Sequence, residues 1–220
     1  MTHRLLSLLS LLIFSVSILP GCATTAYNIQ ERFGIEKRDI LVDRVENVAK
    51  SQADAKEEFE DALEAFRAVV NVDGGELEDM YDDLNKAYKN ADSQAGEVRS
   101  RVSSVKRVAR DLFKEWEGEL SQYSDAGLRR TSESQLRETQ QRYDALTDKM
   151  DAATASMDPV LSVFKDRVLY LKHNLNARAI AALNTETANL EGDVAQLIAE
   201  MEQSISAADA FIRDMSGSTS

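Results

Sequence analysis

From residue 36 onward, apolar side chains recur at alternating steps of three and four residues, and only short polar segments interrupt them. This spacing puts the apolar side chains on one face of an α-helix and is typical of helices that pack side by side. Segments 71–75 and 124–127 contain Gly, Asn, Asp and Ser, which favour turns and end helices. We therefore predict helices over residues 36–70 and 77–123, and a third that continues to about residue 173.

The third run contains Pro159, the single proline that follows residue 20. A proline inside a helix removes one backbone hydrogen bond and kinks the rod. The apolar pattern also slips by one position after Phe164. We predict a bend at Pro159, with Asp158 as a local N-cap.

A change of phase marks the next boundary, because residues 172–177 contain neither Gly nor Pro. Continuing the third stripe beyond Leu175 would bury Arg178 and Asn189, whereas a shifted stripe buries apolar positions from Ile180 to Met215. We predict a turn at residues 174–176, with Asn176 capping a fourth helix. A single long kinked helix with a rotated seam is the alternative.

Four helices of similar length with short connections favour an up-down-up-down arrangement. Two prolines and 6% aromatic residues disfavour a turn-rich β protein. The predicted fold class is all-α: an elongated antiparallel helical bundle or coiled coil of about four long helices. We assign the bundle to residues 36–215 and a flexible tail to residues 216–220.

A basic stretch on the second helix needs a partner of opposite charge, and the first helix offers one. Folding the hairpin about Asp73 brings acidic residues of the first helix near basic residues of the second. The expected groups are Glu36, Asp39 and Asp43 with Arg110, Arg107 and Arg101, and Glu57 and Glu60 with Lys89 and Lys86. The alternative is that Arg99, Arg101, Lys106, Arg107, Arg110 and Lys114 bind an external anionic partner.

The N-terminal sequence is typical of a secretion signal. Arg4 is followed by an apolar run from Leu5 to Leu19, which is short for a membrane-spanning helix. Leu19, Gly21 and the single cysteine, Cys22, then resemble a bacterial lipobox, in which the thiol is acylated and the leader is cut off. We predict a signal peptide over residues 1–21 and an acylated Cys22 with a tether over 22–35.

Acyl chains on Cys22 would anchor the protein to a membrane effectively permanently. Ala23 after the cysteine resembles lipoproteins of the outer membrane, so we expect the periplasmic side of the bacterial envelope. An ordinary secreted protein cut near Ala23, with a free thiol, is the alternative. The formal net charge of −12 disfavours nucleic acid as a partner.

Reactive side chains are scarce in the sequence. His173 is the one histidine beyond the leader, so zinc, haem and iron–sulfur sites built on His and Cys within one chain are excluded. Gly74 and Gly75 precede Glu76 and not the Lys-Ser/Thr of a phosphate-binding loop. We expect no enzymatic activity, no metal and no cofactor; an unrecognised carboxylate site is the remaining enzymatic alternative.

Four residues are candidates for partner binding. His173, Asn174 and Asn176 lie at the predicted turn between the third and fourth helices, where polar side chains cap helices or contact a partner. Trp116, near the end of the second helix, packs in the core or, if exposed, marks a partner site. Heptad seams close within one chain or between chains, so the pattern leaves homo-oligomers open.

Three segments together resemble the bacterial envelope family called domain of unknown function DUF2959. They are Lys37–Val45, Leu112–Trp116 and Leu171–Ala177. The likeness covers nearly all of the chain after the leader. It implies a secreted helical lipoprotein, and it brings no activity, cofactor or catalytic residue to these positions.

We therefore expect a structural or protein-interaction module of the cell envelope that is anchored through Cys22 and presents its far end to envelope proteins. A carrier or sensor that binds an apolar ligand between helices is the alternative. Its motivation is a run of small residues on the second helix, namely Ala87, Ala91, Ala95 and Gly96.

Overall fold

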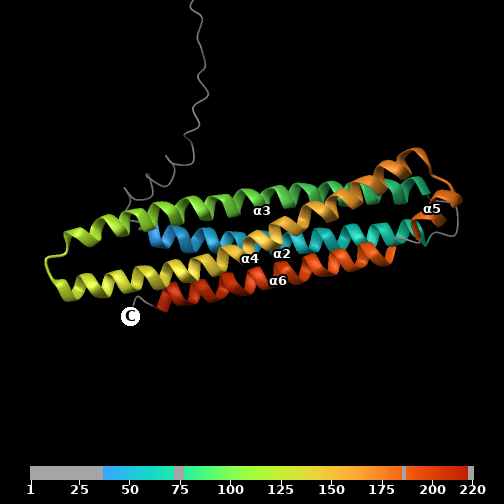
Figure 1. Cartoon of the computed structure of the whole chain (residues 1–220). Helices are drawn as coiled ribbons and strands as arrows, with labels where there is room; N and C mark the ends of the chain where they lie inside the picture. The colour runs from blue at the N-terminus through green and yellow to red at the C-terminus, as the bar shows by residue number, and fades with distance from the viewer. Residues whose placement is uncertain (1–36, 72–76, 185–186, 218–220) are drawn as a thin grey trace, which may run out of the picture. The chain divides into compact units, whose positions relative to one another are not determined.

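The computed structural model describes residues 37–71, 77–184 and 187–217 (Figure 1). The predicted signal peptide, Cys22 with its tether, most of the first turn and most of the predicted tail lie outside the described residues. The described helices all belong to one compact unit, Glu36–Ser220.

Four long helices and two short elements make up the described residues, and no strand occurs among them. They are α2 (Lys37–Val70), α3 (Leu77–Glu119), the 3₁₀ turn η1 (Leu120–Gln122), α4 (Ala126–His173), α5 (Ala177–Asn184) and α6 (Thr187–Gly217). The predicted all-α class is confirmed.

The long helices form an antiparallel bundle. The chain reverses direction between successive long helices, so that α2 and α4 run one way and α3 and α6 run the other (Figure 1). Both α2 and α4 pack against α3 and α6. Helices α2 and α4 therefore lie diagonally opposite each other, as in an up-down-up-down bundle.

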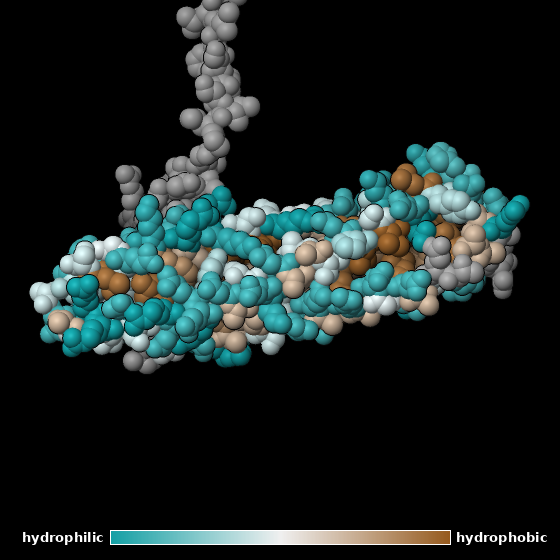
Figure 2. Space-filling view, in the orientation of Figure 1, coloured by the Kyte–Doolittle hydropathy of each residue, from teal (hydrophilic) through white to brown (hydrophobic). Residues whose placement is uncertain are grey.

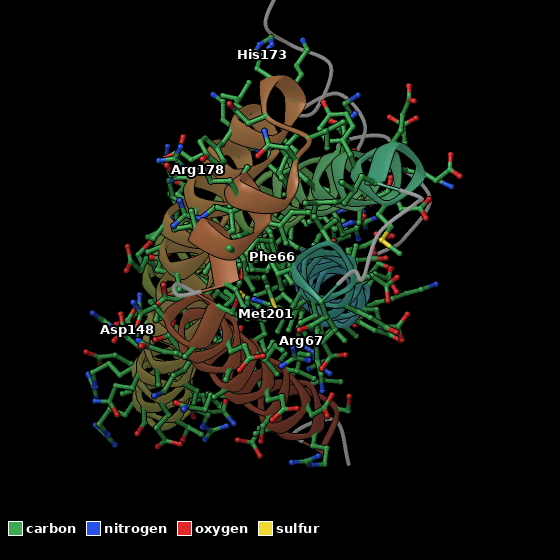
Figure 3. All side chains as sticks on the ribbon, turned by 90° about the vertical axis from the view of Figure 1, so that its right-hand side faces the viewer. Phe66, Arg67, Asp148, His173, Arg178 and Met201 are labelled. Atoms are coloured by element: carbon green, nitrogen blue, oxygen red, sulfur yellow. The ribbon has the colours of Figure 1, made fainter. Side chains whose placement is uncertain are left out.

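The predicted apolar stripes form the core. Every position of the first stripe is buried, namely Leu41, Val45, Val48, Gln52, Ala55, Phe59, Ala62, Phe66 and Val69. In the fourth stripe every position is buried except the half-buried Thr187; the stripe consists of Ile180, Leu183, Thr187, Leu190, Val194, Leu197, Met201, Ser204, Ala208, Phe211 and Met215. Phe66 and Met201 are both fully buried and lie in the interior between the helices (Figure 3). A continuous apolar seam thus joins the helices along their length, which stabilises them more than helix propensity does.

Helix α4 continues through Pro159, so the predicted N-cap at Asp158 is wrong, while the bend at Pro159 stays a prediction. Asp158 is part of the helix and caps nothing; its carboxylate forms an ion pair with Arg99 of α3. Packing along both sides of Pro159 compensates for the missing hydrogen bond, since Met157 and Val160 are buried.

The basic stretch of α3 finds partners other than those predicted. Arg99 pairs with Asp158 and Lys106 pairs with Asp151, both on α4. Arg101 pairs with Glu97 of its own helix. Between α2 and α3 the ion pair has the opposite polarity, with Lys37 of α2 donating to Glu115 of α3 at 2.8 Å. The hairpin prediction misassigned these partners because it considered only two helices of a four-helix bundle.

Both predicted connections between later helices are present, with one shift. The predicted turn at residues 124–127 ends two residues early, since α4 already begins at Ala126. The cause is the N-cap Asp125, whose carboxylate accepts hydrogen bonds from the backbone N–H groups of Gly127 and Leu128. The predicted turn at residues 174–176 is confirmed. The predicted fourth helix is divided into α5 and α6, and residues 185–186 between them lie outside the description.

Candidate functional site

Two asparagines shape the turn between α4 and α5. The Asn174 backbone N–H donates to the carbonyl of Leu171 at 3.0 Å, and its side-chain amide donates to the carbonyl of Tyr170 at 2.9 Å. The Asn176 side-chain oxygen accepts a hydrogen bond from the backbone N–H of Ala179 at 3.1 Å. Both side chains therefore cap helix ends. Their role in partner binding stays a prediction.

His173 is the last residue of α4 and is exposed. Figure 3 views the bundle from this end and shows His173 at its edge, with Arg178 of α5 on the same side. Helix α2 ends and α3 begins at this end too (Figure 1).

The last turns of α4 expose apolar side chains between cations. Leu169 is 49% exposed and Tyr170 is 41% exposed, while the other large hydrophobic side chains with comparable exposure in the described residues, Tyr123 and Leu128, lie at the opposite end. We call this surface the basic ridge; it consists of Lys165, Leu169, Tyr170, Lys172, His173 and Arg178, all exposed. Figure 2 shows hydrophobic side chains gathered near this end of the molecule, among polar ones.

The basic ridge departs from the charge of the rest of the chain. From residue 167 to residue 185 the sequence contains no Asp or Glu, although the formal net charge of the whole chain is −12. Asp166, also exposed on α4, is the nearest carboxylate along the chain. Among the described residues, no ion pair involves Lys165, Lys172 or Arg178.

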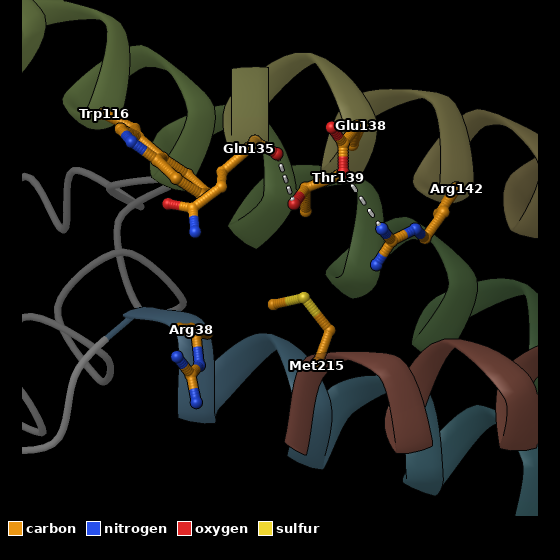
Figure 4. Close-up of a pocket in the computed structure, with 7 residues that line it drawn as sticks. All are labelled: Arg38, Trp116, Gln135, Glu138, Thr139, Arg142 and Met215. Carbon is orange, nitrogen blue, oxygen red and sulfur yellow. Dashed lines mark hydrogen bonds and ion pairs between the residues drawn. The ribbon is translucent and has the colours of Figure 1, made fainter. Parts of the chain in front are cut away.

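Trp116 lies near the opposite end of the bundle, beside a cleft of about 270 Å³ (Figure 4). Its indole N–H donates to the Ser132 hydroxyl at 2.8 Å, and the Tyr123 hydroxyl lies 3.4 Å from the same oxygen. The residues around the cleft are Arg38, Trp116, Gln135, Glu138, Thr139, Arg142 and Met215. The half-buried indole thus joins α3 to α4, as expected for packing at the end of a bundle.

Arg142 of the cleft is paired with two carboxylates. Arg142 lies 3.4 Å from Glu138 of its own helix and 3.8 Å from Asp214 of α6. The Thr139 hydroxyl donates to the carbonyl of Gln135 at 2.8 Å. The contact between Arg142 and Asp214 connects α4 to α6.

The small residues of α3 differ in exposure. Ala91 and Ala95 are fully buried, so they allow close packing of helices. Ala87 is half-buried, and Gly96 is exposed with no atom within 4 Å of the position a Cβ would take. The prediction that Gly96 contributes to internal space is therefore wrong.

Within residues 37–71, 77–184 and 187–217, no group of three or more His, Cys, Asp or Glu residues is placed to hold a metal ion. No helix in those ranges has the length and apolar content needed to span a bilayer.

The sequence analysis did not identify Leu169 and Tyr170 as exposed surface residues. It also did not identify Ser132 as the residue of α4 that binds Trp116 of α3. Leu169 and Tyr170 occupy positions off the apolar stripe, beside a long segment without acidic residues. These two signals together could have indicated a surface. Ser132 lies four residues before Leu136 and so extends the third stripe, but a serine at that position gives no sign of its hydrogen bonds.

A family profile described as "Protein of unknown function (DUF2959)" matches residues 26–215. No curated protein and no solved structure matches the chain.

Proposed function

The chain belongs to the DUF2959 family, whose profile covers most of its length, and from that premise we propose that it is a lipid-anchored envelope lipoprotein that works through contact with other proteins. In this proposal Cys22 holds the chain to the periplasmic side of the bacterial envelope, in the outer membrane. The helical bundle then carries a contact surface away from the anchor.

The anchor rests on the lipobox-like residues Leu19, Gly21 and Cys22. Residues 23–36 join Cys22 to the first described helix, which begins at Lys37. Fourteen residues span up to about 50 Å when fully extended, so the bundle is not forced to lie on the lipid surface.

The arrangement of the bundle supports a contact function. Helix α2 begins in the half of the bundle that is remote from the turn between α4 and α5 (Figure 1). The basic ridge is therefore at the end remote from the start of α2. This combination of an exposed apolar pair with flanking cations, far from the attachment point, is the observation that carries the proposal.

Metabolic labelling with a palmitate analogue tests the anchor. We expect label in the intact chain and none in a Cys22→Ser variant, with the unlabelled variant recovered free of membranes. An intact chain that takes up no label would contradict the anchor.

Photo-crosslinking in intact cells tests the contact surface. A crosslinking amino acid at Tyr170 should capture protein adducts, whereas the same amino acid at Ala155, an exposed position in the middle of α4, should capture far fewer. Equal yields at both positions would contradict a specific surface. The paired change Asn174→Ala and Asn176→Ala tests whether the two caps contribute to recognition, provided that circular dichroism shows unchanged helicity.

A further inference from the structure

The basic ridge has a complement elsewhere on the same bundle. A groove of about 260 Å³ lies between α2 and α3. We call it the acidic groove; its lining residues are Asp61, Glu64, Ala65, Ala68, Met80 and Asp83. The three carboxylate-bearing side chains are exposed, and Ala65 and Met80 are half-buried. The groove thus presents apolar surface next to negative charge, whereas the ridge presents apolar surface next to positive charge.

The two surfaces lie at nearly the same height along the bundle. The ion pair between Arg99 and Asp158 fixes the register of α3 against α4. Counting from this pair along the antiparallel helices places Asp83 at about the level of Asn174. The acidic groove therefore lies at the same end of the bundle as the basic ridge.

The two surfaces face different sides. The ridge is on α4 and α5, and α4 lies diagonally opposite α2, which forms one wall of the groove. Consider two copies that stand side by side with their bundles parallel. Because ridge and groove lie at equal height on different sides, the ridge of one copy then meets the groove of the other. Such a contact is heterologous, since the two copies use different patches.

We propose that the basic ridge of one copy docks into the acidic groove of a second copy of this chain. Leu169 and Tyr170 cover the apolar surface formed by Ala65, Ala68 and Met80. Lys165, Lys172 and Arg178 lie opposite Asp61, Glu64 and Asp83. Because ridge and groove are complementary in charge within one sequence, we take the protein that the ridge contacts in the proposed function to be a second copy of this chain.

The common orientation of the copies rests on the proposed function. Copies anchored through Cys22 in one membrane have their bundles on the same side of it, which suits a parallel contact. Anchoring also raises the local concentration of each copy, so a small interface suffices.

Cysteine crosslinking of the intact chain tests the contact. One tagged copy carries Leu169→Cys and a differently tagged copy carries Ala68→Cys; both sites are exposed. A short bismaleimide applied to cells should give the mixed dimer. The matched control replaces Leu169→Cys with Ala155→Cys, which lies on α4 away from the ridge, and should give about tenfold less product.

Charge reversal gives the sharper result. Changing Asp61 and Glu64 to Lys in the groove copy puts like charges opposite the ridge and should lower the crosslink yield about tenfold. Changing Lys165 and Lys172 to Glu in the ridge copy should restore it. Yields that stay constant across these combinations would overturn the proposal.

Palmitate labelling of the same samples separates the two proposals. Absent crosslinks with normal labelling would overturn self-association and leave the anchor intact. Absent labelling with crosslinks between Leu169→Cys and Ala68→Cys would contradict the anchor and support the contact. The control for this readout is the parent chain, whose only cysteine is Cys22. Any crosslink that it forms comes from an unacylated Cys22 thiol and is subtracted.

Discussion

At the scale of single residues, the core contains polar atoms that its packing leaves unpaired. Gln52 and Ser204 are fully buried, and neither the Gln52 amide nor the Ser204 hydroxyl has a hydrogen-bond partner within the described part of the chain. Burying an amide without a partner costs about 1–3 kcal/mol. Such residues are retained in some helical assemblies because they fix the register of the helices.

Replacing Gln52 with Leu should therefore raise the free energy of unfolding by about 1 kcal/mol, since it removes the desolvated amide and keeps a side chain of similar size. Urea unfolding followed by circular dichroism measures the change. The control is Gln196→Leu on the exposed face of α6, which should stay within about 0.5 kcal/mol of the parent. A clear loss of stability in Gln52→Leu would mean that the amide binds ordered water.

Tyr143 makes stability sensitive to alkaline pH. Its burial, with added repulsion from Asp144 and Asp151, raises the pKa of its hydroxyl to about 12, compared with about 10 in an unfolded chain. The Tyr143 ring also packs edge-on against the Phe113 ring, with the two ring centroids 5.3 Å apart. Because the folded state favours the neutral hydroxyl, this contribution is complete below about pH 10 and is lost as the pH rises toward 12.

A Tyr143→Phe variant keeps the ring contact and removes the ionisable hydroxyl. It should lose less unfolding free energy than the parent between about pH 8 and pH 11, measured by urea unfolding at each pH. If both proteins lose the same amount over that interval, the Tyr143 hydroxyl does not contribute to the pH dependence.

Buried positions were predictable from the sequence, and the exposed apolar residues of the basic ridge were not. The stripe from Leu41 to Val69 is buried at every step, including Gln52, because period alone decides which face of a helix turns inward. Leu169 and Tyr170 lie off the stripe, and their exposure depends on where α4 ends relative to its neighbours. That depends on tertiary structure, which the period does not encode.

At the scale of helices, the N-cap of α4 carries a testable contribution. The Asp125 carboxylate accepts hydrogen bonds from Gly127 at 2.7 Å and Leu128 at 2.8 Å. An Asp125→Ala change should lower the free energy of unfolding by about 1 kcal/mol. Asp148→Ala is the matched control, since Asp148 is exposed in the interior of the same helix. Equal effects of the two changes would argue against capping.

Helix ends were harder to predict than helix bodies. Local rules favoured Asp158 as an N-cap beside Pro159, yet the buried side chains on both sides of Pro159 keep α4 continuous and Asp158 inside it. Conversely, the change of phase near Asn174 predicted a real turn, because a stripe can change face only if the chain reorients. Signals that affect the whole seam were therefore more reliable than a single unfavourable residue.

At the scale of the whole bundle, its length is the clearest observable. Helix α4 contains 48 residues, which extend over about 70 Å. A protein without residues 1–36 should give a maximum dimension of at least that size in X-ray scattering. Its radius of gyration should exceed the value of about 16 Å typical of a compact domain of this length. A smaller value would contradict the bundle.

The even number of long helices returns the end of α6 to the end of the bundle where α2 starts (Figure 1). A fluorescent protein or affinity tag fused after Ser220 would therefore lie near the start of α2, away from the basic ridge, and would leave the ridge accessible. An insertion into the connection between α2 and α3 would instead carry its cargo beside that ridge and block approaching molecules. The choice of fusion site thus decides whether a labelled protein leaves the proposed contact surface accessible.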